Sequence, residues 1–167
     1  MNDLGFITLS NGQVAIVDAA ALPLVTPYRW CPMRKRDGRV YAQAHGPRRD
    51  GTQSTILMHS LILGTPKGMA SDHQNHDGLD NRRSNLRACT RAQNLSNRGK
   101  TIANTSGYKG VDWVKRIGTW RAQIGVQNKH LFLGHFTDPV AAARAYDAAA
   151  RRLHGEFART NFAEETT

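Results

Sequence analysis

Regular alternation of apolar and polar residues over 120–127 is the feature that most restricts the fold of this chain. Trp120, Ala122, Ile124 and Val126 occupy every second position of that stretch. Successive side chains of a β-strand point to opposite faces, so a period of two places all four on one face. The stretch is therefore predicted to be a strand with one buried face, and another strand is expected around 131–136.

A helix signal follows these strands. Asp138-Pro139 combines a residue that caps a helix N-terminus with a proline suited to the first helical position. The helix is predicted to run to about Leu153 and to end at Gly155, because glycine is common at helix C-termini. Its many alanines allow a close approach to a sheet. Residues 107–163 are therefore predicted to form a small domain in which a three-stranded antiparallel sheet packs on one helix.

The N-terminal part of the chain is predicted to consist of short strands. Asn11-Gly12 lies between two apolar runs, which is a strong signal for a β-hairpin. Further strands are expected at three places: 28–30, 40–44 and 55–63. Residues 66–98 are dense in Asn, Asp, His and Arg, a poor composition for a core, and residues 99–106 are predicted to be a linker. The predicted domains are therefore 1–98 and 107–163.

The charge of the chain points to a polyanionic partner. Lys and Arg number 23 against 13 Asp and Glu, and the formal charge is +10. The excess is spread along the chain: residues 1–65 carry 7 basic and 4 acidic side chains, residues 66–100 carry 7 and 3, and residues 101–167 carry 9 and 6. A distributed surplus suggests several surfaces that face one polyanion, and double-stranded DNA is the expected partner. The alternative is a basic protein with no role in nucleic-acid binding.

Several classes of protein are excluded or disfavoured. The sequence contains no run of 18 apolar residues and no secretion signal, so we expect a cytoplasmic protein with no membrane contact. Cys31 and Cys89 lie far apart and form no CxxC pair, which excludes a cysteine zinc site.

The polar stretch 66–98 contains the residue types that phosphodiester cleavage requires. The reaction needs a base that deprotonates water and a positive partner for the leaving oxygen. Asp72 and Asn94 offer the oxygen ligands that Mg²⁺ (or Mn²⁺) accepts, and His73 offers a base that titrates near neutrality. Residues 88–90 are predicted to end a strand, and Thr90 and Gln93 form a capping box that starts a short helix.

Three segments of this stretch carry a family resemblance: Asp72-His73, Leu79–Arg87 and Gln93–Asn97. With their neighbours from about Met58 to Arg98, they resemble the HNH endonuclease family, in the subgroup where Asn replaces the last His. The resemblance implies an α+β fold in which the N-terminal strands lead into a ββα-metal motif.

The resemblance also implies a role for each matching residue. Asp72 is expected to be a metal ligand, and His73 the general base. Asn85 is expected to orient that base and brace the loop, and Asn94 to be the second protein ligand. Arg82, Arg83 and Arg87 are candidates for phosphate contacts, with plain solvation as the alternative.

Some residues near the motif keep two interpretations. His59 is either a phosphate contact or a satisfied structural histidine, and the role of Asn97 is open. His76, beside Asp77-Gly78, is interpreted as a turn residue rather than a ligand.

The C-terminal domain carries a second resemblance, on five segments: Ser106–Val111, Trp120–Ile124, Leu133–Phe136, Ala141–Asp147 and Gly155–Phe162. They are similar to the DNA-binding domain of plant Apetala and ethylene-response factors (AP2/ERF). The resemblance implies that the sheet enters the major groove, which is wide enough for strands. Asp112, Gly125 and Phe132 differ from the residues that the plant domains place there, so the plant recognition sequence does not transfer.

Basic, amide and aromatic side chains of this domain are the candidates for DNA contact: Lys109, Trp113, Lys115, Arg116, Arg121, Gln123, Gln127 and Lys129. Trp113 has a second interpretation, because an aromatic residue on a small sheet is more often packing. Trp120 and Tyr146 are expected in the core.

Together these features predict a homing-type endonuclease of a phage or mobile element. We expect it to act as a monomer, to need no obligate protein partner and to nick one strand of duplex DNA. Two alternatives remain: a DNA-binding regulator that has lost cutting, and a nuclease without target preference.

Overall fold

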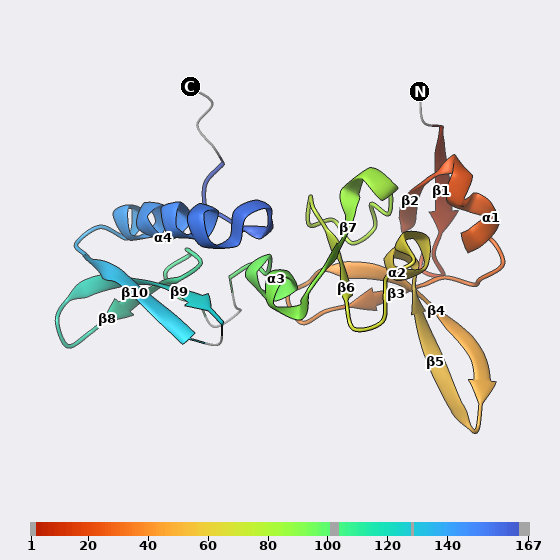
Figure 1. Cartoon of the computed structure of the whole chain (residues 1–167), viewed down its shortest axis with the longest axis horizontal. Coiled ribbons are helices and arrows are strands. Elements are labelled where there is room, and N and C mark those ends of the chain that lie inside the picture. Colours follow the sequence, from red (N-terminus) through yellow and green to blue (C-terminus); the bar gives the residue numbers. More distant parts are fainter. Residues whose placement is uncertain (1–2, 101–103, 128, 164–167) are drawn as a thin grey trace. The chain divides into compact units, whose positions relative to one another are not determined.

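The computed structural model describes residues 3–100, 104–127 and 129–163 (Figure 1). Internal contacts divide the chain into a first unit, Met1–Arg91, and a second unit, Ala92–Thr167. Both units combine antiparallel β-sheet with helices, so the predicted α+β class is confirmed. Residues 101–103 of the predicted linker lie outside the described residues, and the domain bounds 1–98 and 107–163 stay a prediction. No helix in the described ranges is long and apolar enough to cross a membrane.

The first unit contains three antiparallel sheets with the orders β1-β2, β3-β4-β5 and β6-β7. Its strands are β1 (Leu4–Thr8), β2 (Val14–Asp18), β3 (Cys31–Arg34), β4 (Val40–Arg49), β5 (Thr52–Leu57), β6 (Ala70–His73) and β7 (Leu86–Cys89). Its helices are the 3-10 turn η1 (Ala19–Ala21), α1 (Leu22–Val25), α2 (Met58–Leu63) and the 3-10 turn η2 (Arg83–Asn85).

The hairpin predicted at Asn11-Gly12 is confirmed. β1 pairs with β2, with Thr8 opposite Val14. The backbone N–H of Gly12 donates to the Leu9 carbonyl at 2.9 Å. Gly12 has a φ of 84°, a conformation that glycine adopts without the steric cost of a side chain.

The strand predicted over 55–63 is only half correct. β5 ends at Leu57, and Met58–Leu63 form the helix α2. This helix buries Met58, His59 and Ile62, which lie on one face at helical spacing. Gly64, at φ 64°, ends the helix by donating its N–H to the carbonyls of residues 60 and 61. Tertiary burial and the left-handed glycine therefore select a helix where a short apolar run alone is ambiguous.

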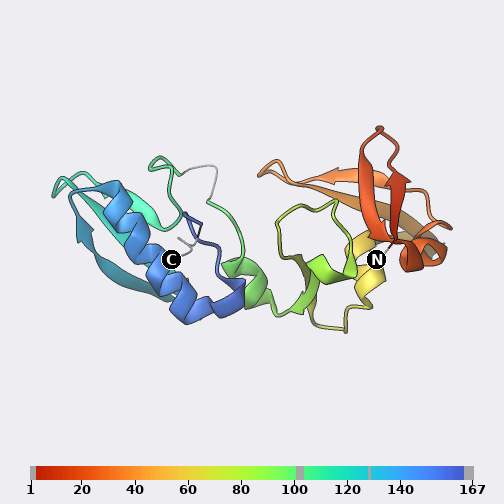
Figure 2. The ribbon, with the colours of Figure 1, turned by 90° about the horizontal axis from the view of Figure 1, so that it is seen from above.

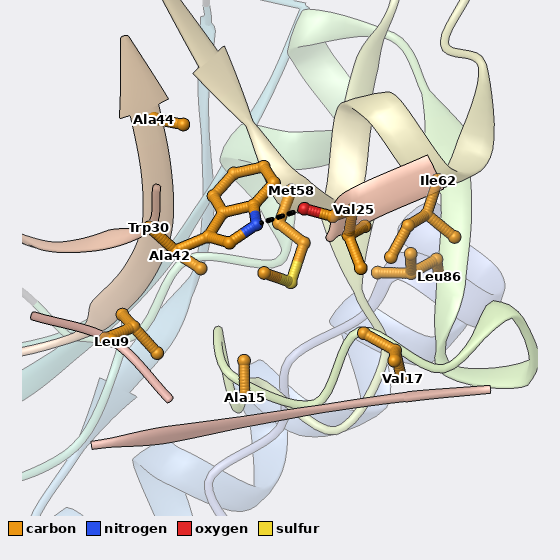
Figure 3. Packing of buried hydrophobic residues seen from close by; sticks show 10 residues of the cluster. All are labelled: Leu9, Ala15, Val17, Val25, Trp30, Ala42, Ala44, Met58, Ile62 and Leu86. Atoms are coloured by element: carbon orange, nitrogen blue, oxygen red, sulfur yellow. Dashed lines mark hydrogen bonds between the residues drawn. The ribbon is translucent and has the colours of Figure 1, made fainter. Parts of the chain in front are cut away.

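The strand predicted at 28–30 is also displaced. β3 begins at Cys31, and the residues before it form a turn after α1. The Trp30 indole N–H donates to the Val25 carbonyl at the end of α1, at 2.8 Å (Figure 3). Trp30 is thus a core residue whose single polar atom is satisfied by a helix terminus.

One hydrophobic core joins the elements of the first unit (Figure 3). Its buried side chains come from β2, α1, β4, α2 and β7 and from the turns between them: Leu9, Ala15, Val17, Val25, Trp30, Ala42, Ala44, Met58, Ile62 and Leu86. Burying one large apolar side chain contributes about 1.5–3 kcal/mol. Because Leu86 begins β7, this core fixes the strand pair that carries the predicted catalytic residues.

The second unit contains a three-stranded sheet of order β10-β9-β8 with one long helix on one face (Figure 2). Its elements are β8 (Val111–Val114), β9 (Thr119–Val126), β10 (Lys129–Phe136), α4 (Pro139–His154) and the 3-10 turn η3 (Gly155–Phe157). A short helix, α3 (Arg91–Ser96), begins where the units divide. The predicted sheet backed by one helix is confirmed.

Local signals for this unit are confirmed in detail. The Asp138 carboxylate accepts the N–H groups of Val140 and Ala141 at 3.2 and 2.9 Å, which caps α4, and Gly155 is its C-cap. Ala122 and Ile124 of β9 are buried against α4, whereas Arg121 and Gln123 point to the opposite face. Tyr146 is buried as predicted, but Trp120 is only half buried.

Candidate active site

The predicted catalytic pair lies on the ribbon of β6 and β7. Asp72 is opposite Arg87, and His73 is opposite Leu86. The Arg87 guanidinium donates from Nε and Nη2 to Oδ2 of Asp72 at 3.0 and 2.9 Å. Both side chains are largely buried. Arg87, a candidate for phosphate contact, therefore neutralises and orients the Asp72 carboxylate.

His73 lies in a buried cluster of rings. Its ring centroid is 4.9 Å from that of His59, in an edge contact, and 5.6 Å from that of Tyr41. Burial lowers the pKa of His73, and this effect is opposed by the contact with Asn81 and by the charge of Asp72. A histidine with a lowered pKa is neutral at physiological pH, which is the state that can accept a proton.

The hydrogen bond of His73 fixes which ring nitrogen can act as the base. Nε2 lies 3.3 Å from Oδ1 of Asn81. The Asn81 amide is itself oriented, since its Nδ2 donates to the Leu79 carbonyl at 3.1 Å. Oδ1 can only accept, so Nε2 carries the hydrogen and Nδ1 keeps the lone pair. Asn81 thus fixes the tautomer of the His73 imidazole.

Asn85, expected to orient the base and brace the loop, contacts the loop. Its Nδ2 donates to the Asp80 carbonyl at 2.7 Å and to Oδ1 of Asn75 at 2.9 Å. Its Oδ1 accepts the Asn75 N–H at 3.0 Å. Among the described residues, the partner of the His73 imidazole is Asn81 rather than Asn85. The sequence motif contains both asparagines, and spacing alone does not distinguish them.

His59 is the residue of the site that the sequence left undecided. It is 6% exposed, and its Nδ1 is buried without a hydrogen-bond partner in the described part of the chain. Burial, with smaller contributions from His73 and Lys35, lowers its pKa to about 3. His59 is therefore a neutral ring that packs against the edge of His73, and Tyr41 packs against both. Neither contact could be read from the sequence, because α2 and β4 lie far from residue 73 along the chain.

Two further arginines of the motif also make contacts within the first unit. Arg82 donates to both carboxylate oxygens of Asp80 at 2.7 and 2.6 Å and holds the pKa of Asp80 below its usual value. Arg83 donates from Nη2 to the Ile62 carbonyl at 2.6 Å, and its N–H donates to Asp18 at 2.7 Å. Contacts of either arginine with phosphate stay a prediction.

The loop that holds Asn81 rests on the N-terminal strands. The Ile16 N–H donates to the Leu79 carbonyl at 2.8 Å, and the Asn81 N–H donates to the Ile16 carbonyl at 2.7 Å. A Cβ on Gly78 would lie 2.2 Å from the Val40 carbonyl oxygen, so only glycine fits there. The N-terminal strands therefore help to build the site.

The donor atoms suit a hard divalent cation. Mg²⁺ is commonly held by one or two protein oxygens, with water and phosphate as the other ligands. The described residues contain no cluster of three or more His, Cys, Asp or Glu that could hold a metal. The Asp72 carboxylate and the Asn94 amide are oxygen donors of the required kind. Asp72 lies in the first unit and Asn94 lies on α3 in the second, so their joint coordination of one ion stays a prediction.

The candidates for DNA contact in the second unit occupy different positions. Lys115 and Arg116 are exposed in the turn between β8 and β9. Gln127 and Lys129 are exposed at the turn between β9 and β10. Arg121 and Gln123, of β9, lie on the sheet face opposite α4.

Trp113 is 43% exposed, whereas Lys109 is half-buried. Trp113 is opposite Trp120, with 5.0 Å between ring centroids, on the side of the sheet that packs on α4. Lys109 donates from Nζ to the Ser96 carbonyl of α3 at 2.6 Å, and burial lowers its pKa to about 8. Lys109 therefore contacts the end of α3, which is a structural role within the second unit.

Comparison with known proteins identifies the motif that contains Asp72 and His73. The HNH endonuclease family model matches residues 61–96, which include β6, β7 and α3. Protein 3.8 of Escherichia phage T7 is 34% identical over 95 residues, which are 56% of this chain and 77% of that protein. The chain belongs to the HNH endonuclease family. Its HNH segment contains the Asp72-His73 pair and the loop around Asn81.

Plant proteins are similar to part of this HNH family member. An AP2/ERF and B3 domain-containing protein of Oryza sativa subsp. japonica is 50% identical over 58 residues, 35% of this chain and 16% of that protein. The AP2-like ethylene-responsive transcription factor TOE2 of Arabidopsis thaliana is 42% identical over 60 residues, 36% of this chain and 12% of that protein. The chain spans about a sixth or less of these relatives. The predicted combination of an HNH segment with an AP2/ERF-type segment is confirmed.

Proposed function

We propose that this chain is a homing-type DNA endonuclease that hydrolyses one phosphodiester bond and nicks one strand of a duplex. The observation that carries the proposal is the buried, neutral His73 beside Asp72, within the segment that the HNH family matches. The proposed setting is the cytoplasm of a bacterial host, in keeping with the phage relative.

His73 is proposed to accept a proton from the attacking water at Nδ1. Asn81 holds the opposite nitrogen in its protonated form, so the lone pair needed for the base is present before water binds. His59 and Tyr41 limit rotation of the imidazole by packing against it. Ring orientation matters because a general base must lie within hydrogen-bond reach of the proton that it removes.

Asp72 and Asn94 are proposed to hold one Mg²⁺ (or Mn²⁺) ion, which when bound supplies positive charge for the leaving oxygen. Arg87 orients the Asp72 carboxylate by its two hydrogen bonds. Asn85 braces the loop that carries Asn81, and so supports the base indirectly.

The sheet of the second unit is proposed to read part of the DNA target. The similarity to plant DNA-binding domains supports this role, as do the exposed cations at both of its turns. One active site in one chain cuts one strand for each binding event, so a monomer without an obligate protein partner is expected to produce nicks.

Incubation with supercoiled plasmid carrying a randomised insert tests the proposal. We expect the nicked circle to form with Mg²⁺ and not with EDTA, before any linear product. The inserts of the nicked molecules identify the preferred sites. Direct formation of linear DNA contradicts nicking, and absence of cleavage with every divalent ion favours a DNA-binding regulator that has lost cutting.

A further inference from the structure

A polar network lies on the open face of the sheet in the second unit. Asp112 of β8 is directly opposite Arg121 of β9. Arg121 donates from Nη2 to Oδ2 of Asp112 at 2.8 Å and from Nε to Oδ1 at 3.3 Å. Gln123, two residues further along β9, donates from Nε2 to the same carboxylate at 3.2 Å. The carboxylate is therefore held by two side chains of the central strand.

The Asp112 carboxylate contacts only one edge of the Arg121 guanidinium. A guanidinium carries five N–H groups in a planar fork, and a carboxylate that accepts from Nε and Nη2 occupies its side edge. The end edge, formed by Nη1 and the second hydrogen of Nη2, has no partner among residues 104–127 and 129–163. Asp112 thus fixes the plane of Arg121 and leaves two parallel donors directed away from it.

The surroundings of Arg121 leave room for a planar ligand. The neighbouring positions on β10 are His135, opposite Arg121, and Phe132, opposite Gln123. The Phe132 side chain is 56% exposed, and a Cβ placed on Gly125 would meet nothing within 4 Å. The central strand therefore presents its donors on an open surface rather than in a packed core.

We propose that Arg121 reads a guanine in the major groove of duplex DNA, and that Asp112 is the residue that positions it. The inference rests on the proposed role of the second unit in DNA binding. Guanine presents two acceptors on its major-groove edge, O6 and N7, which match two parallel N–H donors.

The charge of Asp112 decides between a base and a phosphate as the partner of Arg121. A carboxylate bonded to the guanidinium cancels most of its net charge and repels a second anion that approaches. The guanine acceptors O6 and N7 carry no net charge, so the Asp112 carboxylate repels them much less than it repels a phosphate. Exposed cations such as Lys115 and Arg116, which have no such carboxylate partner among the described residues, suit phosphate better.

The test uses the full chain in EDTA, so that binding is measured without cleavage. Duplexes selected from a random library give the preferred sequence, and each guanine in it is then replaced by 7-deazaguanine, which lacks the N7 acceptor. We expect one position at which this replacement weakens wild-type binding by roughly 5- to 150-fold. At that position Arg121→Lys, which keeps the charge but not the fork, is expected to bind both duplexes equally.

Asp112→Asn separates positioning from contact. It is expected to lose most of the guanine preference while binding to an unrelated duplex stays equal or rises, because the variant loses a negative charge that repels phosphate. Asp37→Asn is the matched control, because Asp37 forms another surface Asp–Arg pair, with 2.6 Å between its Oδ2 and Nη2 of Arg39 in the first unit. This variant should leave the guanine preference unchanged.

Three results overturn the proposal, and the first two are distinguishable from failure of the nuclease assignment. If the 7-deazaguanine effect persists in Arg121→Lys, another residue reads the base. If wild type binds every duplex equally, no base is read, although metal-dependent nicking of plasmid can still stand. Absence of duplex binding under all conditions rejects both this inference and the DNA-binding role.

Discussion

Replacing His59 by phenylalanine tests the electrostatics of the ring cluster, because it keeps an aromatic ring and removes the titration. The pKa of His59 falls from the ordinary value of 6.5 to about 3 in the folded chain, mainly through burial. Between these values the unfolded imidazole binds a proton and the folded one does not. Such a group contributes stability above its unfolded pKa and loses it as the pH falls.

The size of the effect follows from the two pKa values. Each pH unit below 6.5 costs the folded state about 1.4 kcal/mol relative to the unfolded state. Between pH 7 and pH 5 the loss due to His59 is therefore about 2 kcal/mol. The pKa of His73 is lowered as well, so the wild type is expected to lose more than this in free energy of unfolding between pH 7 and pH 5. Over the same range, His59→Phe is expected to lose about 2 kcal/mol less than the wild type.

The assay is urea unfolding of the first unit at both pH values, followed by the fluorescence of Trp30. Trp113 and Trp120 lie in the second unit, and replacing both by phenylalanine in every chain compared leaves Trp30 as the single reporter. His45→Phe, at an exposed position of β4, is the matched control. Equal pH dependence in wild type and His59→Phe would refute the assignment of a buried neutral imidazole.

Four further substitutions test the packing and the hydrogen bonds of the two units. Gly78→Ala should destabilise the first unit by about 1–3 kcal/mol, because its Cβ would overlap the Val40 carbonyl, whereas Gly125→Ala, with open space around it, should be tolerated. Asp138→Ala removes the cap of α4 and should cost about 1 kcal/mol in thermal or urea unfolding of the second unit. Asp147→Asn should lower the free energy of unfolding of the second unit by about 1–3 kcal/mol. The buried Asp147 carboxylate accepts the N–H groups of residues 161 and 162 at 2.8 and 2.9 Å, and an amide keeps only one acceptor. Unchanged stability would contradict that hydrogen-bonding role.

The structure of the second unit followed closely from local sequence. The alternation over 120–127, the capping Asp138 and the terminal Gly155 act within a few residues of themselves, and each is found where it was predicted. Lys109 is different, because its burial depends on contacts with α3 that spacing along the chain does not reveal.

Long-range packing explains what the sequence did not predict in the first unit. The helix α2 is selected by the burial of one face, and the same burial brings His59 against His73. The choice of Asn81 over Asn85 as the partner of His73 depends on how the loop pairs with Ile16. The HNH motif identified the residue types of the site, whereas the contacts between them required the fold.

The rate of single-turnover DNA cleavage by His73→Ala, compared with wild type at saturating Mg²⁺, tests the central claim most directly. Loss of a general base is expected to slow cleavage by roughly 100-fold or more, with duplex binding unchanged. His45→Ala, which removes an exposed imidazole from the same unit, should cleave at the wild-type rate. Cleavage by His73→Ala at the wild-type rate would contradict the account, because the buried imidazole on β6 would then have no part in activating water.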